Sequence, residues 1–291
     1  MSFVETSDEL LREVIQPRKV DSHKGDNGVV AIVGGSRIFH GAPYFASSAA
    51  FRVGADLVYL GAPKSIVSPL RAMAPELIVF PLVDEKLTRG AATAFLKWLP
   101  EVDSLVIGPG FGRQSIDGAK KIVSELCLER KVKVSLDAEV QNIQIYEIVR
   151  GKGCVTTPHP GEFKRIFKRD AGETLEDKIK NVKEKASEFG ITIVLKSNET
   201  VISDGESVYV TKISNAAMTC GGIGDTLSGI VGALLAQCAG TQVRTVEIAA
   251  AASHITELAG LRAAQLKGYH IIATDITNEI STVLKPFDRT Q

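Results

Sequence analysis

Short β-branched runs alternate with helical patterns along most of this 291-residue chain, and this alternation is what most restricts its fold. Residues 28–35 (GVVAIVGG) predict a buried strand, residues 42–54 a helix packed on a sheet, and residues 56–63 the next strand. The order strand, helix, strand is typical of parallel strands joined by a crossover. We therefore predict an α/β protein with a central, mostly parallel sheet.

The same alternation continues toward the C-terminus. Further strands are predicted at 77–80, 104–110, 132–139, 154–162 and 191–196, with helices at 91–99, 118–129 and 174–188. Asp204 and Gly205 predict a hairpin, because this pair favours a tight turn. Two long helices, 226–237 and 246–265, are expected to close the chain. No repeat or linker interrupts the pattern, so we expect one domain over 1–291, with residues 1–20 as an N-terminal helical extension.

Composition excludes several classes of function. Lys plus Arg and Asp plus Glu both number 34, and this balance favours neither nucleic acid nor an anionic membrane as a partner. No apolar run is long enough to cross a membrane, and the N-terminus has no signal-peptide pattern, so a cytoplasmic location is expected. The four cysteines are scattered without metal-ligand spacing and are predicted to be free thiols.

In residues 220–229 (CGGIGDTLSG), three glycines at 221, 222 and 224 come just before one acid, Asp225, where an apolar helix is expected to begin. Glycines let an anion approach the backbone N–H groups, and the positive end of the helix dipole points to the same place. A carboxylate beside a phosphate site is suited to accepting the proton of a hydroxyl that attacks phosphorus. Asp225 is therefore a candidate base, with a plain helix cap and glycine turn as the alternative.

Several nucleotide-binding motifs are missing. The chain has no GxxxxGK[ST] sequence and no set of protein-kinase motifs. IVGGS after the first predicted strand lacks the GxGxxG spacing of a classical dinucleotide fold. A phosphate site at 220–229 would therefore belong to another class of protein.

Six ordered segments give the sequence a specific resemblance. The segments are KGDNGVVAIVGGSRIFHGAPYFASSAAFRVGADLV (24–58), VIGPGFG (106–112), LDAE (136–139), TPHPGEF (157–163), VLKSNETVISDG (194–205) and NAAMTCGGIGDTLSGIVGALLAQ (215–237). Together they resemble the ADP- or ATP-dependent NAD(P)H-hydrate dehydratases of the ribokinase-like superfamily. The resemblance implies a three-layer α/β/α fold and covers nearly the whole chain. It also implies repair of NADHX and NADPHX by phosphorylation of the C6 hydroxyl and loss of phosphate, with Mg²⁺ and with ADP or ATP as co-substrate.

The resemblance also implies roles for particular residues. Asp225 matches the catalytic acid, and Gly222 and Gly224 match the anion hole. The residues that match the nucleotide-binding segments are Lys196, Ser197, Asn198, Glu199, Thr200, Asn215 and Gly224. Those that match the substrate pocket are Ala42, Gly110 and His159, with Glu162 after the histidine. Asp137 is a candidate to assist magnesium through water, and no metal ligand is assigned.

Some alternatives stay open. Lys196 could be a surface lysine at the end of an edge strand, and Ala42 and Gly110 could serve only a helix and a turn. The family pattern is altered at Ser214-Asn215, Ala217-Met218, Ile223 and Lys196-Ser197. An alcohol kinase such as hydroxyethylthiazole kinase, or a non-catalytic adenine-nucleotide sensor, is the alternative function. A homo-oligomer, with the tetramer common in the family, and a separately encoded NAD(P)H-hydrate epimerase are further expectations.

Overall fold

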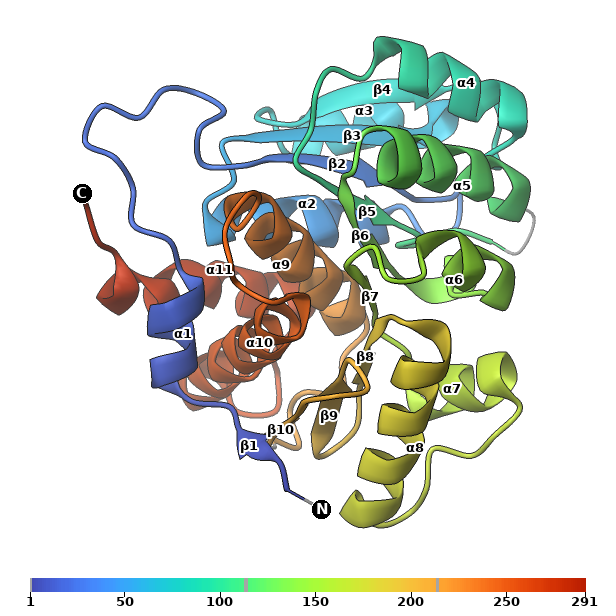
Figure 1. Ribbon diagram of the computed structural model, residues 1–291. Helices are drawn as coiled ribbons and strands as arrows, with labels where there is room; N and C mark the ends of the chain where they lie inside the picture. The colour runs from blue at the N-terminus through green and yellow to red at the C-terminus, as the bar shows by residue number, and fades with distance from the viewer. Residues whose placement is uncertain (1, 113–114, 213–214) are drawn as a thin grey trace.

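The computed structural model describes residues 2–112, 115–212 and 215–291, and its centre is a sheet of ten strands (Figure 1). The strand order is β1-β10-β9-β8-β7-β6-β5-β2-β3-β4. The strands are β1 (Val4–Glu5), β2 (Val29–Val33), β3 (Leu57–Pro63), β4 (Ile78–Leu82), β5 (Ser104–Ile107), β6 (Lys133–Leu136), β7 (Cys154–Thr156), β8 (Thr192–Leu195), β9 (Thr200–Ser203) and β10 (Val208–Thr211). The seven strands in the order β4-β3-β2-β5-β6-β7-β8 all pair in parallel with their neighbours. The prediction of a mostly parallel sheet is therefore confirmed.

Helices cover both faces of the sheet. They are α1 (Asp8–Val14), α2 (Gly41–Val53), α3 (Lys64–Met73), α4 (Arg89–Trp98), α5 (Ile116–Val123), α6 (Ile143–Val149), α7 (Pro160–Phe167), α8 (Leu175–Phe189), α9 (Ile223–Gln237), α10 (Thr245–Lys267) and α11 (Ala273–Leu284). One apolar core lies under α1, α2, α3, α9, α10 and α11, and the second lies under α4 to α8. The three-layer arrangement predicted from the sequence is therefore confirmed.

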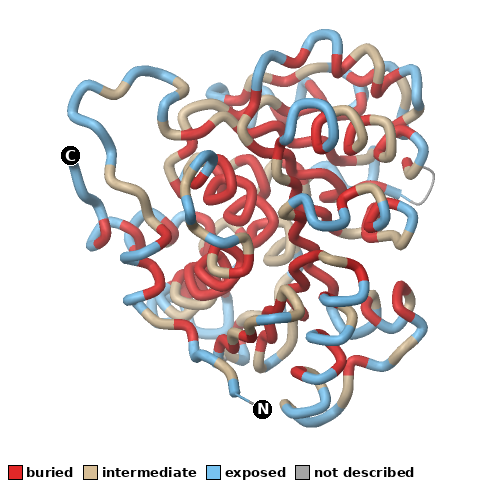
Figure 2. Tube along the Cα trace, viewed as in Figure 1, coloured by how far each residue is buried: buried red, intermediate tan, exposed pale blue. Residues whose placement is uncertain are grey.

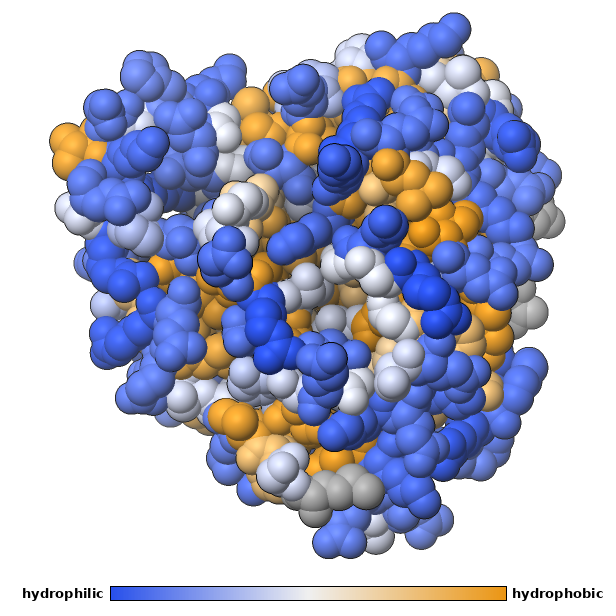
Figure 3. All heavy atoms as spheres, viewed as in Figure 1, coloured by the Kyte–Doolittle hydropathy of each residue, from blue (hydrophilic) through white to orange (hydrophobic). Residues whose placement is uncertain are grey.

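The central strands are buried on both faces, which explains their continuous apolar sequences. β2 (VVAIV) has four buried residues out of five, and Figure 2 shows the sheet and α9 as a connected buried region. α2 and α9 approach closely because Gly229 has no side chain: a Cβ there would lie 2.1 Å from the carbonyl oxygen of Ala46. The outer surface of α8 is hydrophilic in Figure 3, as its charged sequence predicts.

Several elements differ from the sequence prediction. Residues 154–162 do not form one strand, because β7 ends at Thr156 and Pro160 begins α7. Three helices rather than two close the chain, since α11 follows α10. The helix expected over 118–129 is α-helical only to Val123 and continues as a π-helix over Ser124–Glu129. The N-terminal extension contains α1 and also the short strand β1.

The hairpin prediction is confirmed. β9 and β10 pair antiparallel on the far side of β8, and Gly205 between them has a φ of +95°. Asp204 supports the turn because its carboxylate accepts hydrogen bonds from the N–H groups of Glu206 and Ser207. β8 is consequently an interior strand, between β7 and β9.

Candidate active site

The glycine-rich segment forms the N-terminus of α9 at the carboxyl edge of the parallel strands. Gly222 is the N-cap residue, with a φ of +99°, and Asp225 lies in the first turn. A Cβ on Gly222 would lie 2.8 Å from Phe45 of α2 and 2.8 Å from Ala273, so only glycine fits there. Gly221 by contrast faces open space. The helix prediction is confirmed, although the helix begins three residues earlier than expected.

Lys196 brings the separate motifs together. Its Nζ lies 3.7 Å from a carboxylate oxygen of Asp137 and 3.9 Å from one of Glu162. The same Nζ lies 3.1 Å from where a Cβ on Gly224 would be. Lys196 follows the interior strand β8 and is only 25% exposed, so the alternative of a surface lysine on an edge strand is wrong. The ammonium group faces the glycine-rich helix end, where phosphate charge would be bound.

Asp137 follows β6 and is held in place by neighbouring strands. The carboxylate is buried and accepts a hydrogen bond of 2.8 Å from the hydroxyl of Thr157, which follows β7. Its backbone N–H donates to the carbonyl of Ile107 in β5. Gly108 allows this approach, since a Cβ there would lie 1.9 Å from the carbonyl oxygen of Asp137. The glycine after β5 and the acid after β6 thus depend on each other.

Asp225 has a pKa raised from 3.8 to about 7. Burial is the main cause, because it disfavours the charged carboxylate, and the negative charge of Asp137 acts in the same direction. The positive charge of Lys196 opposes both effects and favours ionisation. A carboxylate with a pKa near neutral pH is a stronger base than an ordinary aspartate and is still partly ionised there.

His159 has a structural role that the sequence did not indicate. It is the N-cap of α7: its Nδ1 accepts hydrogen bonds from the N–H groups of Gly161 and Glu162. The carboxylate of Glu162 accepts in return from the N–H of His159, which completes a capping box. Because Nδ1 is an acceptor, the ring proton lies on Nε2. The side chain is 55% exposed, and its Nε2 lies 3.6 Å from a carboxylate oxygen of Glu162.

Ala42 and Gly110 lie together at the first turn of α2. A Cβ on Gly110 would lie 2.9 Å from the Cβ of Ala42 and 2.7 Å from the carbonyl oxygen of Phe39. Gly110 also has a φ of +73°, which favours glycine. Both residues therefore have a packing reason to be small. They lie together at the carboxyl edge of the sheet, beside the start of α2.

The predicted nucleotide segments form tight turns. Between β8 and β9, the Ser197 hydroxyl donates to the carbonyl of Glu199 and the Thr200 hydroxyl to the carbonyl of Ser197, while Asn198 is exposed. The side chain of Asn215 accepts from the N–H of Ala217, so it orients the loop that leads to α9. Of the departures from the family pattern, Ala217 is buried, Met218 packs on Gly260 and Ile223 packs on the core. Ser214 lies outside the described residues.

The residues near Lys196 include no complete protein site for a metal. Within residues 2–112, 115–212 and 215–291, no group of three or more His, Cys, Asp or Glu side chains is arranged to hold a metal ion. Mg²⁺ commonly binds through one or two carboxylates together with substrate phosphates and water. Asp137 and Glu162 fit that partial role. All four cysteines are free, as predicted, and burial raises the pKa of Cys238 to about 11.

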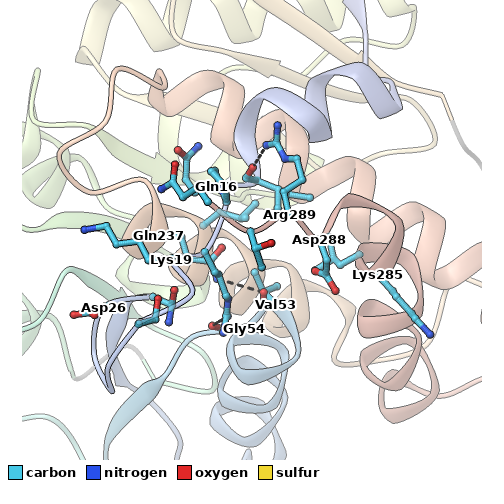
Figure 4. Close-up of a pocket in the computed structure, with 18 of the residues that line it drawn as sticks. Gln16, Lys19, Asp26, Val53, Gly54, Gln237, Lys285, Asp288 and Arg289 are labelled. Atoms are coloured by element: carbon cyan, nitrogen blue, oxygen red, sulfur yellow. Dashed lines mark hydrogen bonds between the residues drawn. The ribbon is translucent and has the colours of Figure 1, made fainter.

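A hollow of about 850 Å³ lies at the opposite, amino-terminal edge of the sheet (Figure 4). It is bordered by the segment after α1 and by the C-terminal tail. These two segments run side by side, and Arg18 and Thr290 form an isolated parallel β-bridge between them. Arg289 donates to the carbonyls of Arg12 and Ile15 at the end of α1. Lys285 points away from the other labelled residues. The hollow contains none of the predicted site residues.

The fold and the carboxyl-edge site define a protein of the ribokinase-like class. A ribokinase-like protein from Enterococcus faecalis aligns with a TM-score of 0.81 at 26% identity, covering 99% of this chain and 97% of that one. A Bacillus subtilis ADP/ATP-dependent NAD(P)H-hydrate dehydratase, co-crystallised with ATP and Mg²⁺, aligns with a TM-score of 0.84 at 25% identity, covering 99% and 100%.

Sequence comparison defines the family within this class. The family model for NAD(P)H-hydrate dehydratase matches residues 30–282. The ADP-dependent (S)-NAD(P)H-hydrate dehydratase of Nitrosopumilus maritimus is 45% identical over 281 residues, which is 96% of each chain. The chain therefore belongs to the NAD(P)H-hydrate dehydratase family, and the resemblance found in its sequence is confirmed.

Sequence reasoning missed two parts of the site. Thr157 holds Asp137, and Phe45 packs on Gly222. Thr157 stands directly before PHPGE in a segment already singled out, so a buried strand-end hydroxyl could have been suspected. Phe45 had no local signal, because its contact depends on how α2 and α9 pack. Among the described residues, no helix is long and apolar enough to span a membrane.

Proposed function

We propose that this chain is an ADP-dependent dehydratase that converts the S epimers of NADHX and NADPHX to NADH and NADPH. The observation that carries the proposal is Asp225 with its raised pKa, set between the glycine-rich start of α9 and the ammonium group of Lys196. A base and an anion site at one helix end are what phosphorylation of a hydroxyl requires. Membership of the dehydratase family supports the substrate.

In the proposed reaction, Asp225 accepts the proton of the C6 hydroxyl as its oxygen attacks the terminal phosphorus of the nucleotide. The N–H groups near Gly222 and Gly224 bind the transferred phosphoryl group, and Lys196 neutralises part of its charge. The ring nitrogen lone pair then expels phosphate from C6, and loss of a proton from C5 restores the dihydronicotinamide. Only the first step needs a base at Asp225.

The remaining residues would bind and orient the two substrates. Lys196 to Thr200 and Asn215 would hold the nucleotide, and Ala42, Gly110 and the Nε2–H of His159 would contact the hydrate. Mg²⁺, when bound with the nucleotide, would neutralise phosphate charge, and Asp137 would assist it through water. Residues 1–291 are taken as one ribokinase-like domain, because every strand described belongs to one sheet.

ADP is the donor we favour, with ATP as the alternative. The 45%-identical relative is named ADP-dependent, which supports ADP. We also propose a cytoplasmic homo-oligomer and a separately encoded epimerase. A source proteome without such an epimerase would contradict that last point. The family match and the retained Asp225 argue against the alternatives of hydroxyethylthiazole kinase and a nucleotide sensor.

The test is to mix the purified protein with NADHX, Mg²⁺ and either ADP or ATP, and to follow the return of NADH absorbance. Recovery with one nucleotide identifies the donor. The Asp225→Asn variant should be slower by roughly 10²- to 10⁴-fold, the usual contribution of a general base. No recovery with either nucleotide, in a protein that still binds both, would overturn the proposal in favour of another alcohol or a sensor.

A further inference from the structure

An exposed aromatic side chain stands at the lip of the candidate site. The segment between β2 and α2 presents Ile38, which is 79% exposed, and Phe39, which is 60% exposed. The turn is fixed because the hydroxyl oxygen of Ser36 accepts a hydrogen bond of 3.1 Å from the N–H of Phe39. Single apolar residues on a surface need no explanation, but an exposed aromatic side chain on a fixed backbone turn beside the candidate site does.

Phe39 contacts the residues predicted to line the substrate pocket. A Cβ on Gly110 would lie 3.2 Å from the Cβ of Phe39 and 2.9 Å from the Cβ of Ala42. These three residues therefore form one wall. Gly110 and Ala42 have little or no side chain. The ring of Phe39 is therefore the largest apolar group among the three residues.

The wall is continuous with the anion site. α2 begins directly after Phe39 and His40, and its Phe45 would lie 3.4 Å from a Cβ on Gly41 and 2.8 Å from one on Gly222. The first turn of α2 thus connects the wall to the N-terminus of α9, where Asp225 lies. Phe39 and Asp225 thus lie at the two ends of this stretch, one just before α2 and the other in the first turn of α9.

We propose that Phe39 packs its ring against the hydrated nicotinamide ring of the substrate and thereby positions the C6 hydroxyl. The inference rests on the proposed function, because it assumes that this ring occupies the pocket. Phe39 is a positioning residue, since it supplies apolar contact and no proton. A contact that is equal in the bound substrate and in the transition state changes KM and leaves kcat unaltered.

The experiment compares Phe39→Ala with Ile38→Ala. Both remove an exposed apolar side chain from the same turn, and Phe39 is the one whose carbonyl oxygen and Cβ lie against Gly110. Phe39→Ala keeps the Cβ contact with Gly110 and the backbone bond to Ser36, so its melting temperature should match that of the wild type. We expect KM for NADHX to rise roughly five-fold in Phe39→Ala, as the loss of a ring contact predicts. The kcat value and KM for the nucleotide should not change, Phe39→Tyr should restore KM, and Ile38→Ala should stay within about two-fold.

A second substrate locates the contact. The reduced and hydrated form of nicotinamide mononucleotide carries the same ring without the adenosine half. The same rise in KM with this fragment supports packing on the nicotinamide ring, and a rise confined to the dinucleotide overturns it in favour of the adenine. An unchanged KM in Phe39→Ala, or an equal rise in Ile38→Ala, also overturns the inference. If the wild type itself restores no NADH, the proposed function fails first.

Discussion

The two edges of the parallel sheet use charged side chains in different ways. At the carboxyl edge, Lys196 lies between Asp137, Glu162 and the glycine-rich start of α9, and the pKa of Asp225 is raised. At the amino-terminal edge, the guanidinium of Arg18 donates to the carbonyl of Gly54, and that of Arg289 donates to carbonyls at the end of α1. The first set converges on the start of α9, and the second is bonded to backbone carbonyls at the ends of α1 and α2.

The comparison shows that the size of a hollow does not identify an active site. The hollow of about 850 Å³ lies at the amino-terminal edge, where two of its basic side chains hold the terminal segments in place. The carboxyl edge is marked instead by convergent charges from separate strands and by a buried acid with a raised pKa. Substitutions at the two edges should therefore separate activity from stability.

After Asp225→Asn, the largest effect is expected at Gly222, and its neighbour Gly221 provides the control. Gly222→Ala places a Cβ at a φ of +99° and 2.8 Å from Phe45 and Ala273, so the start of α9 must shift. A displaced anion hole should cost roughly 10²- to 10³-fold in kcat. Gly221→Ala meets open space and is the matched control, expected to stay near wild-type activity. Steady-state kinetics of both variants test this, and equal losses would contradict the assignment of the hole to Gly222.

The charges around Asp225 should shift the pH profile in opposite directions. Asp225 must be ionised to accept a proton, and its pKa is about 7, so kcat/KM should rise as pH increases through neutrality. Lys196→Met removes the charge that lowers this pKa and should move the rise to higher pH, with a loss of roughly 10- to 100-fold at neutral pH. Asp137→Asn removes a charge that raises the pKa and should move it to lower pH.

The pH dependence of kcat/KM in Lys196→Met and Asp137→Asn tests whether Asp225 is the titrating group. A rise at the same pH as in the wild type in both variants would mean that Asp225 is not the titrating group.

The raised pKa of Asp225 also predicts how stability depends on pH. Between about pH 4 and pH 7 the folded chain keeps a proton on Asp225 that the unfolded chain has released, so this group's contribution to stability decreases as pH rises through that window.

The carboxyl-edge site could largely be predicted because its signals are local. Glycines beside an acid, a lysine after a buried strand and a histidine between prolines are all visible in short stretches of sequence. The approach of Asp137 and Lys196 agrees with a parallel sheet, since the carboxyl ends of parallel strands share one edge. The interior position of β8 did not follow, because strand order depends on pairing between distant segments.

The amino-terminal edge could not be predicted at all. Arg289 reaches Arg12 and Ile15 from the other end of the chain, and nothing near Arg289 in the sequence indicates these partners. α11 was missed although its sequence carries a helical signal: Ile276, Ile280, Val283 and Leu284 recur at helical spacing and are buried. The cap role of His159 was missed because histidine is not among the usual N-cap residues.

A smaller effect is expected where His159 combines two roles. His159→Asn keeps a good helix cap but removes the Nε2–H, so it should raise KM for the hydrate by roughly two- to ten-fold with the melting temperature unchanged. His159→Ala removes the cap as well and should also lower the melting temperature. Kinetics and thermal unfolding of the two variants separate the roles. A wild-type KM in His159→Asn would leave His159 with a structural role only.

The smallest effect on activity is expected at the amino-terminal edge. Arg289→Ala leaves the carbonyls of Arg12 and Ile15 without their donor, which should cost roughly 1 kcal/mol of unfolding free energy and lower the melting temperature by about 2–4 °C. Lys285→Ala is the control, because Lys285 borders the same hollow and its side chain points away from the other labelled residues. Both variants should keep kcat and KM within about two-fold. A clear loss of activity in Arg289→Ala, at a temperature where the variant is folded, would mean that the two edges are coupled. Such coupling would have a direct structural route, because α2 and α9 both begin at the candidate site and end beside the hollow.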